Sequence, residues 1–431
     1  MKIAIVAYGL EGKASYTYYS KNPSNDITIF DQNAELNAPE GVKTVLGTDA
    51  FEKLEDYDLI LRSPPISPHS LKTRGKIWSV TNEFFEKCPV PIIGVTGTKG
   101  KGTTSSMIAS IFEATGKKVW LVGNFGLAAL DVLDQIQPDD IVVYELSSFQ
   151  LWDIERSPYV AVVLPIEPEH LDVHKDFEDY VDAKAHITRF QSEGDICVYN
   201  PTNEYSRSIG ERSGASNRFQ YTTKTPGSVY VEEGFFKRNE QIICSVSELQ
   251  LRGDHNKENA CAAITVAHEL GVSNDDIAAG IRNFKGLPHR IEFVRNVDGV
   301  DYYNDSFSSS TPATYAAICA FEQPEIVIMG GVDRGGDFEH FAGDISGFTN
   351  LKEFVLIGEI RHKLADILQG ERIDTKITVL DATTMKEIVE YARSQARSGD
   401  VIILSPGCAS FDMFKDFYDR GDQFREVVNA L

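Results

Sequence analysis

The stretch IIGVTGTKGKGTT (92–104) decides the fold class of this chain, because it joins an apolar run to a glycine-rich loop. Residues 92–96 predict a buried strand, and a helix-like run follows at 105–114. A glycine-rich loop between a strand and a helix presents backbone N–H groups to phosphate oxygens. The sequence therefore predicts a phosphate-binding α/β domain.

The loop is a shortened phosphate-binding motif, GxxGK. Its candidate phosphate-binding residues are Gly97, Thr98, Lys99, Gly100, Lys101, Gly102, Thr103 and Thr104. Lys101 supplies a point charge for the terminal phosphates, and a hydroxyl directly after such a lysine usually coordinates magnesium. Because Gly102 stands there instead, Thr103 or Thr104 must take that role. We expect ATP as the ligand, and a solvated loop is the alternative.

Two candidate metal ligands follow later strands. Strands are predicted at 119–122, 141–145 and 160–165, and their alternation with helices predicts a mostly parallel sheet. Glu145 ends one strand and His170 follows the next, so we expect both at adjacent strand ends as ligands of a divalent cation. Taken singly, a helix-capping acid and a solvated histidine are the simpler interpretations.

The N-terminal residues have the pattern of a Rossmann-type unit. An apolar run at 2–8 leads into the turn from Gly9 to Gly12, and a second run at 26–30 ends at Asp31. The turn reads AxGxxG, and Asp31 lies where an acid binds a ribose hydroxyl in such folds. A glycine turn that serves only strand-to-helix packing is the alternative.

The last third of the chain repeats the pattern of a strand followed by a polar or glycine-rich loop. Three such loops lie at 304–312, 330–336 and 405–410. We expect them at one edge of a second doubly wound sheet, where Arg334, hydroxyls and helix N-termini hold an anionic small molecule.

These segments together predict an α/β protein of three domains. We expect a Rossmann-like domain at 1–90, a central ATPase with a mostly parallel sheet at 91–285, and a doubly wound, Rossmann-like domain at 286–431. The residues alone thus predict an ATP-using enzyme in which two α/β domains face each other across a cleft.

The composition argues against several classes of partner. The 431 residues include 42 Lys plus Arg and 64 Asp plus Glu, and the net charge of -22 repels nucleic acid and anionic membranes. The six cysteines have no metal-finger spacing and predict reduced core residues. No apolar run approaches the roughly 18 residues of a membrane span, so we expect a cytoplasmic protein.

Further motifs are spread over the whole chain. They are GVTGTKGKGTT (94–104), GNFGLAAL (123–130), YELSSFQL (144–151), EPEHLD (167–172), DAKAHI (182–187), HNKENACAA (255–263), GLPHRIE (286–292), NDS (304–306), GGVDRGGDF (330–338) and LSPGCASFDMFKDFYDRGDQF (404–424). In order and spacing they resemble the Mur ligase family of amide-bond-forming enzymes.

The resemblance implies three domains and a reaction. The N-terminal domain is expected to bind the uridine diphosphate of the substrate, the central domain ATP, and the C-terminal domain to close over the cleft. The members it resembles most add D-glutamate to UDP-N-acetylmuramoyl-L-alanine in peptidoglycan precursor synthesis. ATP phosphorylates the substrate's carboxylate, and the amine of glutamate attacks the acyl phosphate. Two magnesium ions and a monomer are expected as well.

The resemblance also assigns roles to residues. Catalytic roles fall to Lys101, Glu145, His170 and Lys184, the last as a carbamylated lysine. Magnesium ligands are expected at Thr103, Glu145, His170 and Lys184. Positions that contact ATP are matched by Asn259, Arg290 and Asp305, besides the glycine-rich loop. Substrate-binding positions are matched by Gly9, Leu10, Glu11, Gly12, Asp31, Ser63, Asn124, Ser147, Arg334, Ser410, Phe411 and Phe417.

This chain departs from the family pattern at three positions. Phe307 replaces a lysine expected near the incoming amino acid, Glu11 replaces a small or hydroxyl residue beside the diphosphate, and Gly102 replaces a hydroxyl. Ligases that attach L-glutamate to the same acceptor have a similar serine-rich loop, so L-glutamate is an alternative second substrate. A nicotinamide-dependent oxidoreductase and an ATP-binding switch or motor are alternatives from other classes.

Overall fold

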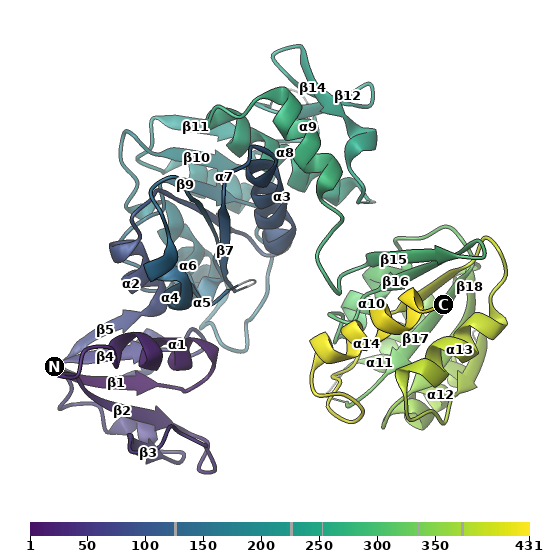
Figure 1. Ribbon diagram of the computed structural model, residues 1–431, viewed down its shortest axis with the longest axis horizontal. Coiled ribbons are helices and arrows are strands. Elements are labelled where there is room, and N and C mark those ends of the chain that lie inside the picture. The colour runs from purple at the N-terminus through teal and green to yellow at the C-terminus, as the bar shows by residue number, and fades with distance from the viewer. Residues whose placement is uncertain (125–126, 225–226, 252, 334–335, 372–374) are drawn as a thin grey trace. The chain divides into compact units, whose positions relative to one another are not determined.

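The structure is a computed structural model that describes residues 1–124, 127–224, 227–251, 253–333, 336–371 and 375–431 (Figure 1). It divides into two compact units, residues 1–250 with 254–284 and residues 251–253 with 285–431. The first unit contains two parallel sheets and a small antiparallel sheet, and the second contains another large sheet.

The N-terminal sheet is parallel and has the strand order β3-β2-β1-β4-β5. Its strands are β1 (Lys2–Val6), β2 (Asp26–Asp31), β3 (Lys43–Leu46), β4 (Leu59–Arg62) and β5 (Lys76–Ser79), and α1 (Leu10–Tyr19) follows β1. β1 is buried on both faces, with Ile3 and Ile5 in one core cluster and Ala4 and Val6 in another. Because the strand order reverses at β1, ligands are expected at the carboxyl ends of β1 and β4.

The central sheet is also parallel, with the order β11-β10-β9-β6-β8-β7. Its strands are β6 (Ile92–Thr96), β7 (Val119–Gly123), β8 (Ile141–Glu145), β9 (Val160–Val163), β10 (Ile196–Tyr199) and β11 (Asn217–Gln220). The helices of this region are α2 (Val80–Lys87), α3 (Lys101–Ala114), α4 (Ala129–Val132), α5 (Ser148–Leu151), α6 (Phe177–Arg189), α7 (Glu204–Glu211), α8 (Asp254–Glu269) and α9 (Asn274–Asn283). A small antiparallel sheet consists of β12 (Tyr230–Glu232), β13 (Phe235–Arg238) and β14 (Gln241–Ser245).

Helix α2 packs with the central sheet. Phe84 and Phe85 make edge-on contacts with Tyr144 of β8, with ring centres 5.5 and 5.6 Å apart. The N-terminal sheet therefore ends at β5, and the helix after it contributes to the core of its neighbour. The division of the chain at residues 90 and 285 stays a prediction.

The second unit has a six-stranded sheet with the order β15-β16-β20-β17-β18-β19. Its strands are β15 (Glu292–Val297), β16 (Val300–Asn304), β17 (Glu325–Gly330), β18 (Leu351–Ile357), β19 (Lys376–Val379) and β20 (Val401–Leu404), all parallel except β15. The helices are α10 (Thr311–Ile318), α11 (Phe338–Ile345), α12 (Arg361–Gly370), α13 (Met385–Gln395) and α14 (Phe417–Asn429). The successive residues Val327 and Ile328 of β17 point to opposite faces of the sheet and belong to two separate apolar clusters. The sheet is therefore covered on both faces.

The predicted fold class, α/β with mostly parallel sheets, is confirmed. All six cysteines are free, and only Cys319 among them is exposed. Within the described ranges, no helix combines the length and the apolar character needed to cross a membrane.

Candidate active site

The glycine-rich loop between β6 and α3 has a backbone that favours glycine at two positions. Gly97 and Gly100 have φ angles of +151° and +82°. A Cβ atom on Gly100 would lie 2.4 Å from Oδ1 of Asn259, a residue of α8. The fold therefore brings Asn259 against the predicted phosphate-binding loop.

Two lysine side chains converge on one carbonyl group of this loop. Nζ of Lys101 donates hydrogen bonds to the carbonyl oxygens of Gly97 and Thr98, at 3.1 and 2.7 Å. Nζ of Lys184, from α6, donates to the same Gly97 oxygen at 2.7 Å. The positive charge of Lys101 acts against protonation of Lys184, because like charges disfavour the charged form.

The surroundings of Lys184 favour its neutral form. The side chain is buried, with Nζ 4.6 Å from the ring centre of Tyr180. Burial holds the pKa of Lys184 well below its usual value, and the charge of Lys101 lowers this pKa further. Glu169 and Glu145 act on it in the opposite direction. A neutral amine is the nucleophilic form that carbamate formation from CO2 requires.

The strands that precede Glu145 and His170 along the chain lie on either side of β6, which carries the loop. β8 ends at Glu145 and β9 precedes His170, and both strands pair with β6 instead of with each other. The expectation that the two residues follow adjacent strands was wrong, because strand order in a doubly wound sheet does not follow chain order. Both strand ends nevertheless flank the glycine-rich loop.

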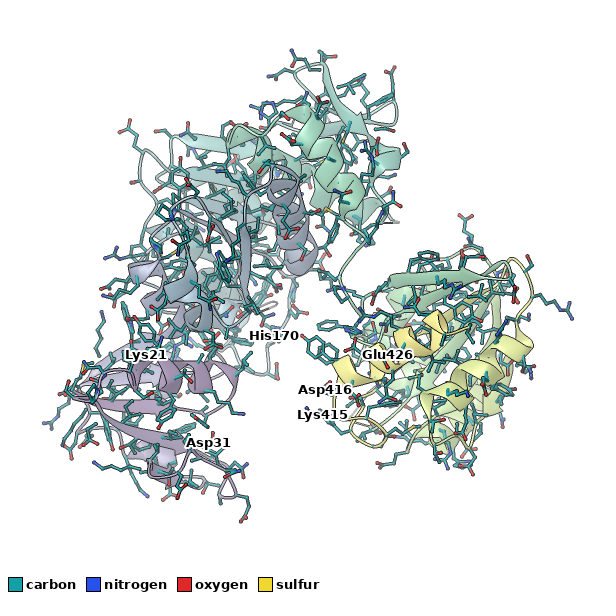
Figure 2. All side chains as sticks on the ribbon, viewed as in Figure 1. Lys21, Asp31, His170, Lys415, Asp416 and Glu426 are labelled. Carbon is teal, nitrogen blue, oxygen red and sulfur yellow. The ribbon has the colours of Figure 1, made fainter. Side chains whose placement is uncertain are left out.

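The two side chains differ in exposure. Glu145 is buried, and its Oε1 accepts a hydrogen bond from Nδ2 of Asn124 at 3.2 Å. His170, labelled in Figure 2, has a left-handed φ of +58° and a side chain that is 47% exposed. Its ring centre lies 5.0 Å from that of Phe149. The imidazole is therefore accessible to a ligand.

The available donors fit magnesium as nucleotide-binding enzymes use it. The described part of the chain contains no group of three or more His, Cys, Asp or Glu side chains that could hold a metal. Mg2+ usually takes one or two protein carboxylates and completes its shell with phosphates and water. In the first turn of α3, Oγ1 of Thr104 is buried and has no hydrogen-bond partner among the described residues. Glu145, His170 and the hydroxyls of Thr103 and Thr104 thus fit an ion shared with a nucleotide.

A buried histidine that the sequence did not single out connects these elements. Nδ1 of His174 lies 2.7 Å from Oδ2 of Asp179, and its Nε2 lies 3.0 Å from Oγ of Ser148. Because a carboxylate only accepts, Nδ1 carries the proton and Nε2 accepts from the serine. The backbone N–H of His174 also donates to the carbonyl of His170 at 3.0 Å. The sequence did not predict that His174 links Ser148, Asp179 and His170, because a lone histidine in a polar turn carries no recognisable pattern.

The AxGxxG turn of the N-terminal sheet has the tight geometry its pattern predicts. Ala7 has a φ of +67°, and a Cβ on Gly12 would lie 2.3 Å from the carbonyl oxygen of Ala7. Oγ of Ser63, at the end of β4, donates to that same oxygen at 2.6 Å. Asp31, labelled in Figure 2, accepts the backbone N–H of Tyr8 at 2.8 Å, so it braces the turn in addition to any role with a ligand.

Side chains at the ends of β4 and β8 join the N-terminal sheet to the central one. Arg62 is buried; its Nε donates to Oδ2 of Asp153 at 2.6 Å and its NH2 group to the carbonyl of Phe149 at 2.9 Å. Gln150 in α5 donates from Nε2 to Oε1 of Glu11 in α1, at 2.8 Å. Leu10, beside Glu11, is 69% exposed. Ser147 caps α5 and Gly9 precedes α1, so these predicted substrate residues lie at the starts of two helices.

In the second unit, the three polar loops follow the neighbouring strands β16, β20 and β17, which confirms that they lie at one edge of the sheet. Hydrogen bonds also join their described residues. Oγ of Ser405 donates to Oδ2 of Asp305 at 2.7 Å, and the backbone N–H of Gly407 donates to the carbonyl of Ser308 at 2.9 Å. Oδ1 of Asp305 accepts the backbone N–H of Ile291 at 3.1 Å. Burial raises the pKa of Asp305 to about 6, although the hydrogen bonds from Ser405 and Ile291 oppose the rise. Asp305 thus fixes the backbone on the C-terminal side of Arg290.

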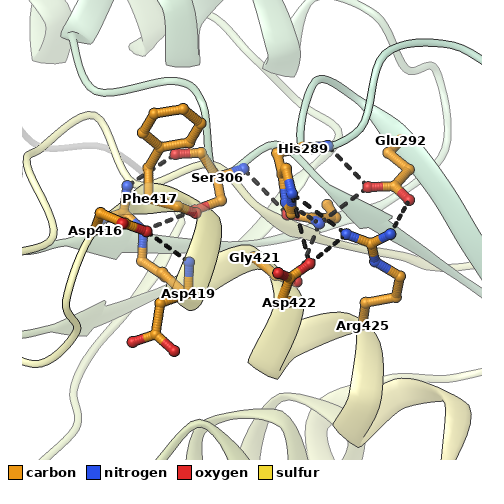
Figure 3. Close-up of polar contacts among 11 residues, drawn as sticks. His289, Glu292, Ser306, Asp416, Phe417, Asp419, Gly421, Asp422 and Arg425 are labelled. Atoms are coloured by element: carbon orange, nitrogen blue, oxygen red, sulfur yellow. Dashed lines mark hydrogen bonds and ion pairs between the residues drawn. The ribbon is translucent and has the colours of Figure 1, made fainter. Parts of the chain in front are cut away.

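A buried polar network supports this edge of the sheet (Figure 3). Nδ2 of Asn304 contacts Nδ1 of His289 at 3.0 Å and donates to Oε2 of Glu292 at 3.1 Å. Arg420, whose side chain is buried, donates through Nε to Oγ of Ser306 at 2.9 Å. These contacts could not be predicted from the sequence, because the partners are distant along the chain.

The remaining predicted substrate residues differ in their surroundings. Ser410 is buried, whereas Phe411 is 58% exposed. Phe417 begins α14 and its ring centre lies 5.2 Å from that of Phe307, the residue that stands in place of the expected lysine. Arg334 lies outside the described residues.

Comparison with known proteins places the chain in a family. Residues 95–267 match the model of the Mur ligase middle domain, and residues 289–408 match that of the Mur ligase, glutamate ligase domain. The chain belongs to the Mur ligase family. Two relatives named UDP-N-acetylmuramoylalanine--D-glutamate ligase, from Clostridium kluyveri and Clostridium tetani, are each 36% identical over 100% of this chain and 97% of their own length.

Solved Mur ligase structures share the fold. A UDP-N-acetylmuramate-alanine ligase MurC from Thermotoga maritima has a TM-score of 0.63 at 16% identity, over 100% of this chain and 99% of its own. MurF from Acinetobacter baumannii has a TM-score of 0.63 at 17% identity, over 81% of this chain and 79% of its own. A family match at both the middle and C-terminal domains leaves the nicotinamide-dependent alternative without support.

Proposed function

We propose that this Mur ligase joins D-glutamate to UDP-N-acetylmuramoyl-L-alanine, with ATP as the energy source, in peptidoglycan precursor synthesis. The observation that carries the proposal is the convergence of Lys101 and Lys184 on the Gly97 carbonyl, in the loop that follows β6. The neighbouring strands are β8, which ends at Glu145, and β9, which precedes His170. The names of the full-length relatives favour D-glutamate over the L-glutamate alternative. The proposal includes a cytoplasmic monomer, with no nucleic acid or membrane as partner.

The reaction needs activation, because a carboxylate is a poor electrophile. A carboxylate oxygen of the alanine attacks the terminal phosphorus of ATP, so that an O–P bond forms and the bond to the leaving ADP breaks. The amine of glutamate then attacks the carbonyl carbon of this acyl phosphate: a C–N bond forms, the C–O bond to phosphate breaks, and the amine loses a proton. Lys101 and the N–H groups of the glycine-rich loop would hold the terminal phosphates, and Asn259 would contact the nucleotide beside Gly100. Arg290 and Asp305 are proposed as further nucleotide-binding residues.

Magnesium would be held by Glu145, His170 and a threonine hydroxyl, Thr103 or Thr104, and two ions are proposed. Bound there, it would neutralise charge between phosphate and carboxylate. Lys184 would support such an ion as a carbamate: its neutral amine adds to CO2, an N–C bond forms, and one proton leaves. The product is an anion with two oxygen ligands.

The glutamate site is proposed on the second unit. Arg334, Ser410, Phe411 and Phe417 would receive the incoming amino acid, and Arg334 would supply the cation lost at Phe307. Gly9, Leu10, Glu11, Gly12, Asp31 and Ser63, together with Asn124 and Ser147, would hold the nucleotide-sugar substrate.

The role of Lys184 can be tested with Lys184→Ala. We expect a large loss of ligase turnover, partly restored by short carboxylic acids that replace the carbamate. Lys175→Ala, which removes an exposed lysine before the same helix, should keep wild-type turnover. In the presence of 13C-bicarbonate, a carbamate carbon signal should appear in the wild type and Lys175→Ala and be absent from Lys184→Ala. Wild-type turnover in Lys184→Ala contradicts the assigned role.

A further inference from the structure

The carboxyl group of Glu11 has one satisfied oxygen and one unsatisfied oxygen. Glu11 lies in the first turn of α1, directly after the AxGxxG turn. Its Oε1 accepts the hydrogen bond from Nε2 of Gln150 at 2.8 Å. Its Oε2 is buried and has no hydrogen-bond partner among the described residues. A buried oxygen without a hydrogen-bond partner costs free energy, unless a bound ligand supplies that hydrogen bond.

Gln150 cannot turn to serve both oxygens, because its amide is held from the other side. The backbone N–H of Ser147 donates to Oε1 of Gln150 at 3.0 Å, and the backbone N–H of Gln150 donates to Oγ of Ser147 at 3.3 Å. This capping arrangement directs the NH2 group toward Glu11 and fixes its position. The environment of the Glu11 carboxyl is therefore preorganised.

The charges around Glu11 do little to stabilise an ionised form. Arg62 of β4 lowers its pKa, but that guanidinium already binds the carboxylate of Asp153. Tyr144 of β8 is another titratable neighbour, and it stays neutral because burial raises its own pKa. Burial is the largest influence and raises the pKa of Glu11 to about 7. Near neutral pH, much of the protein therefore carries a proton on this carboxyl.

The position of Glu11 is one where an ionised carboxylate and a phosphate ligand conflict. In a sheet of this topology, the first turn after β1 receives the phosphates of a nucleotide. A carboxylate there repels the anion, whereas a carboxylic acid O–H donates a hydrogen bond to it. We propose that Glu11 binds the diphosphate of the nucleotide-sugar substrate as a neutral acid, so that substrate binding takes up a proton. This inference rests on the proposed function, which supplies the substrate.

The proposal can be tested by measuring the binding of UDP-N-acetylmuramoyl-L-alanine by calorimetry. The diphosphate of this ligand is esterified at both ends and does not titrate near neutral pH, so proton uptake on binding reports on the protein. We expect wild-type affinity to fall above about pH 7, approaching tenfold per pH unit, because one proton must be supplied. Above that pH, titrations in buffers of different ionisation enthalpy should show uptake approaching one proton per ligand. Glu11→Gln, whose amide also donates, should bind without proton uptake and with an affinity that no longer depends on pH.

A matched control is Glu325→Gln, which makes the same change at a buried glutamate of β17 in the other unit. It should retain the wild-type pH dependence of binding. Binding by the wild type without proton uptake, or a Glu11→Gln variant that retains the pH dependence, overturns the role of Glu11 and leaves the proposed function intact. Absence of binding by the folded wild type at every pH overturns both.

Discussion

Replacing Glu325 with Gln should stabilise the second unit in a pH-dependent way. Glu325 opens β17 and is fully buried; Nδ2 of Asn350 donates to its Oε1 at 2.8 Å, and its Oε2 has no hydrogen-bond partner within the part of the chain described. Burial raises its pKa from 4.5 to about 9. Between these values the folded chain keeps a proton that the unfolded chain has lost, so the free energy of unfolding decreases as pH rises.

The magnitude follows from the difference between the working pH and the unfolded pKa. At pH 7, about 2.5 pH units above the unfolded pKa, the folded protein still keeps this carboxyl protonated. The loss of stability relative to low pH is about 3 kcal/mol, at about 1.36 kcal/mol per unit. Glutamine has nearly the same shape and no proton to retain, so Glu325→Gln should raise the free energy of unfolding by up to about 3 kcal/mol at pH 7. The gain should approach zero near pH 4.5.

Hydrogen exchange of the β17 amides, measured at pH 5 and pH 8, reports the opening of this unit directly. All three tryptophans, Trp78, Trp120 and Trp152, lie in the first unit, so their fluorescence in urea serves as an internal control that should not change. Glu353→Gln is a matched variant, since Glu353 is equally buried but accepts hydrogen bonds from Thr378 and Tyr391. The reasoning is refuted if Glu325→Gln gives the same change at both pH values, or if Glu353→Gln stabilises equally.

Two further substitutions test the geometry of the first unit. Gly100→Ala should lower the free energy of unfolding by about 1 to 2 kcal/mol, because Gly100 has a positive φ. It should also weaken ATP binding, because the new methyl group meets Asn259. Unchanged ATP affinity by calorimetry contradicts this geometry. Arg62→Met should lower the free energy of unfolding of the first unit by about 3 kcal/mol, because Asp153 loses its buried partner, and Arg62→Met with Asp153→Leu should recover part of the loss. Tryptophan fluorescence in urea measures both variants, and equal stability of Arg62→Met and the wild type rules out the buried ion pair.

The sequence predicted the central strands well, because parallel strands covered on both faces are continuous apolar runs, as in Ile92–Thr96 and Val401–Leu404. It missed one interior strand, Ile196–Tyr199, and the edge strands Lys43–Leu46, Lys76–Ser79 and Asn217–Gln220. In the edge strands, exposed polar residues hide the pattern, and only the register with a neighbouring strand defines them.

The candidate site divides in the same way. The glycine-rich loop and its lysine are local features that the sequence displays directly. Strand order is not local, so Glu145 and His170 were placed on adjacent strands when β6 lies between them. Arg62 and Arg420 were missed because their partners Asp153 and Ser306 are 91 and 114 residues away along the chain.

The most direct test of the proposed ligase is phosphate release from ATP in the presence of UDP-N-acetylmuramoyl-L-alanine, compared for D-glutamate, L-glutamate and no amino acid. We predict release that depends on D-glutamate, with a matching amount of the new amide product. Release with L-glutamate alone would show that the loop bearing Phe307 selects the other stereoisomer. Equal release without any amino acid contradicts the ligase and favours an ATP-driven switch.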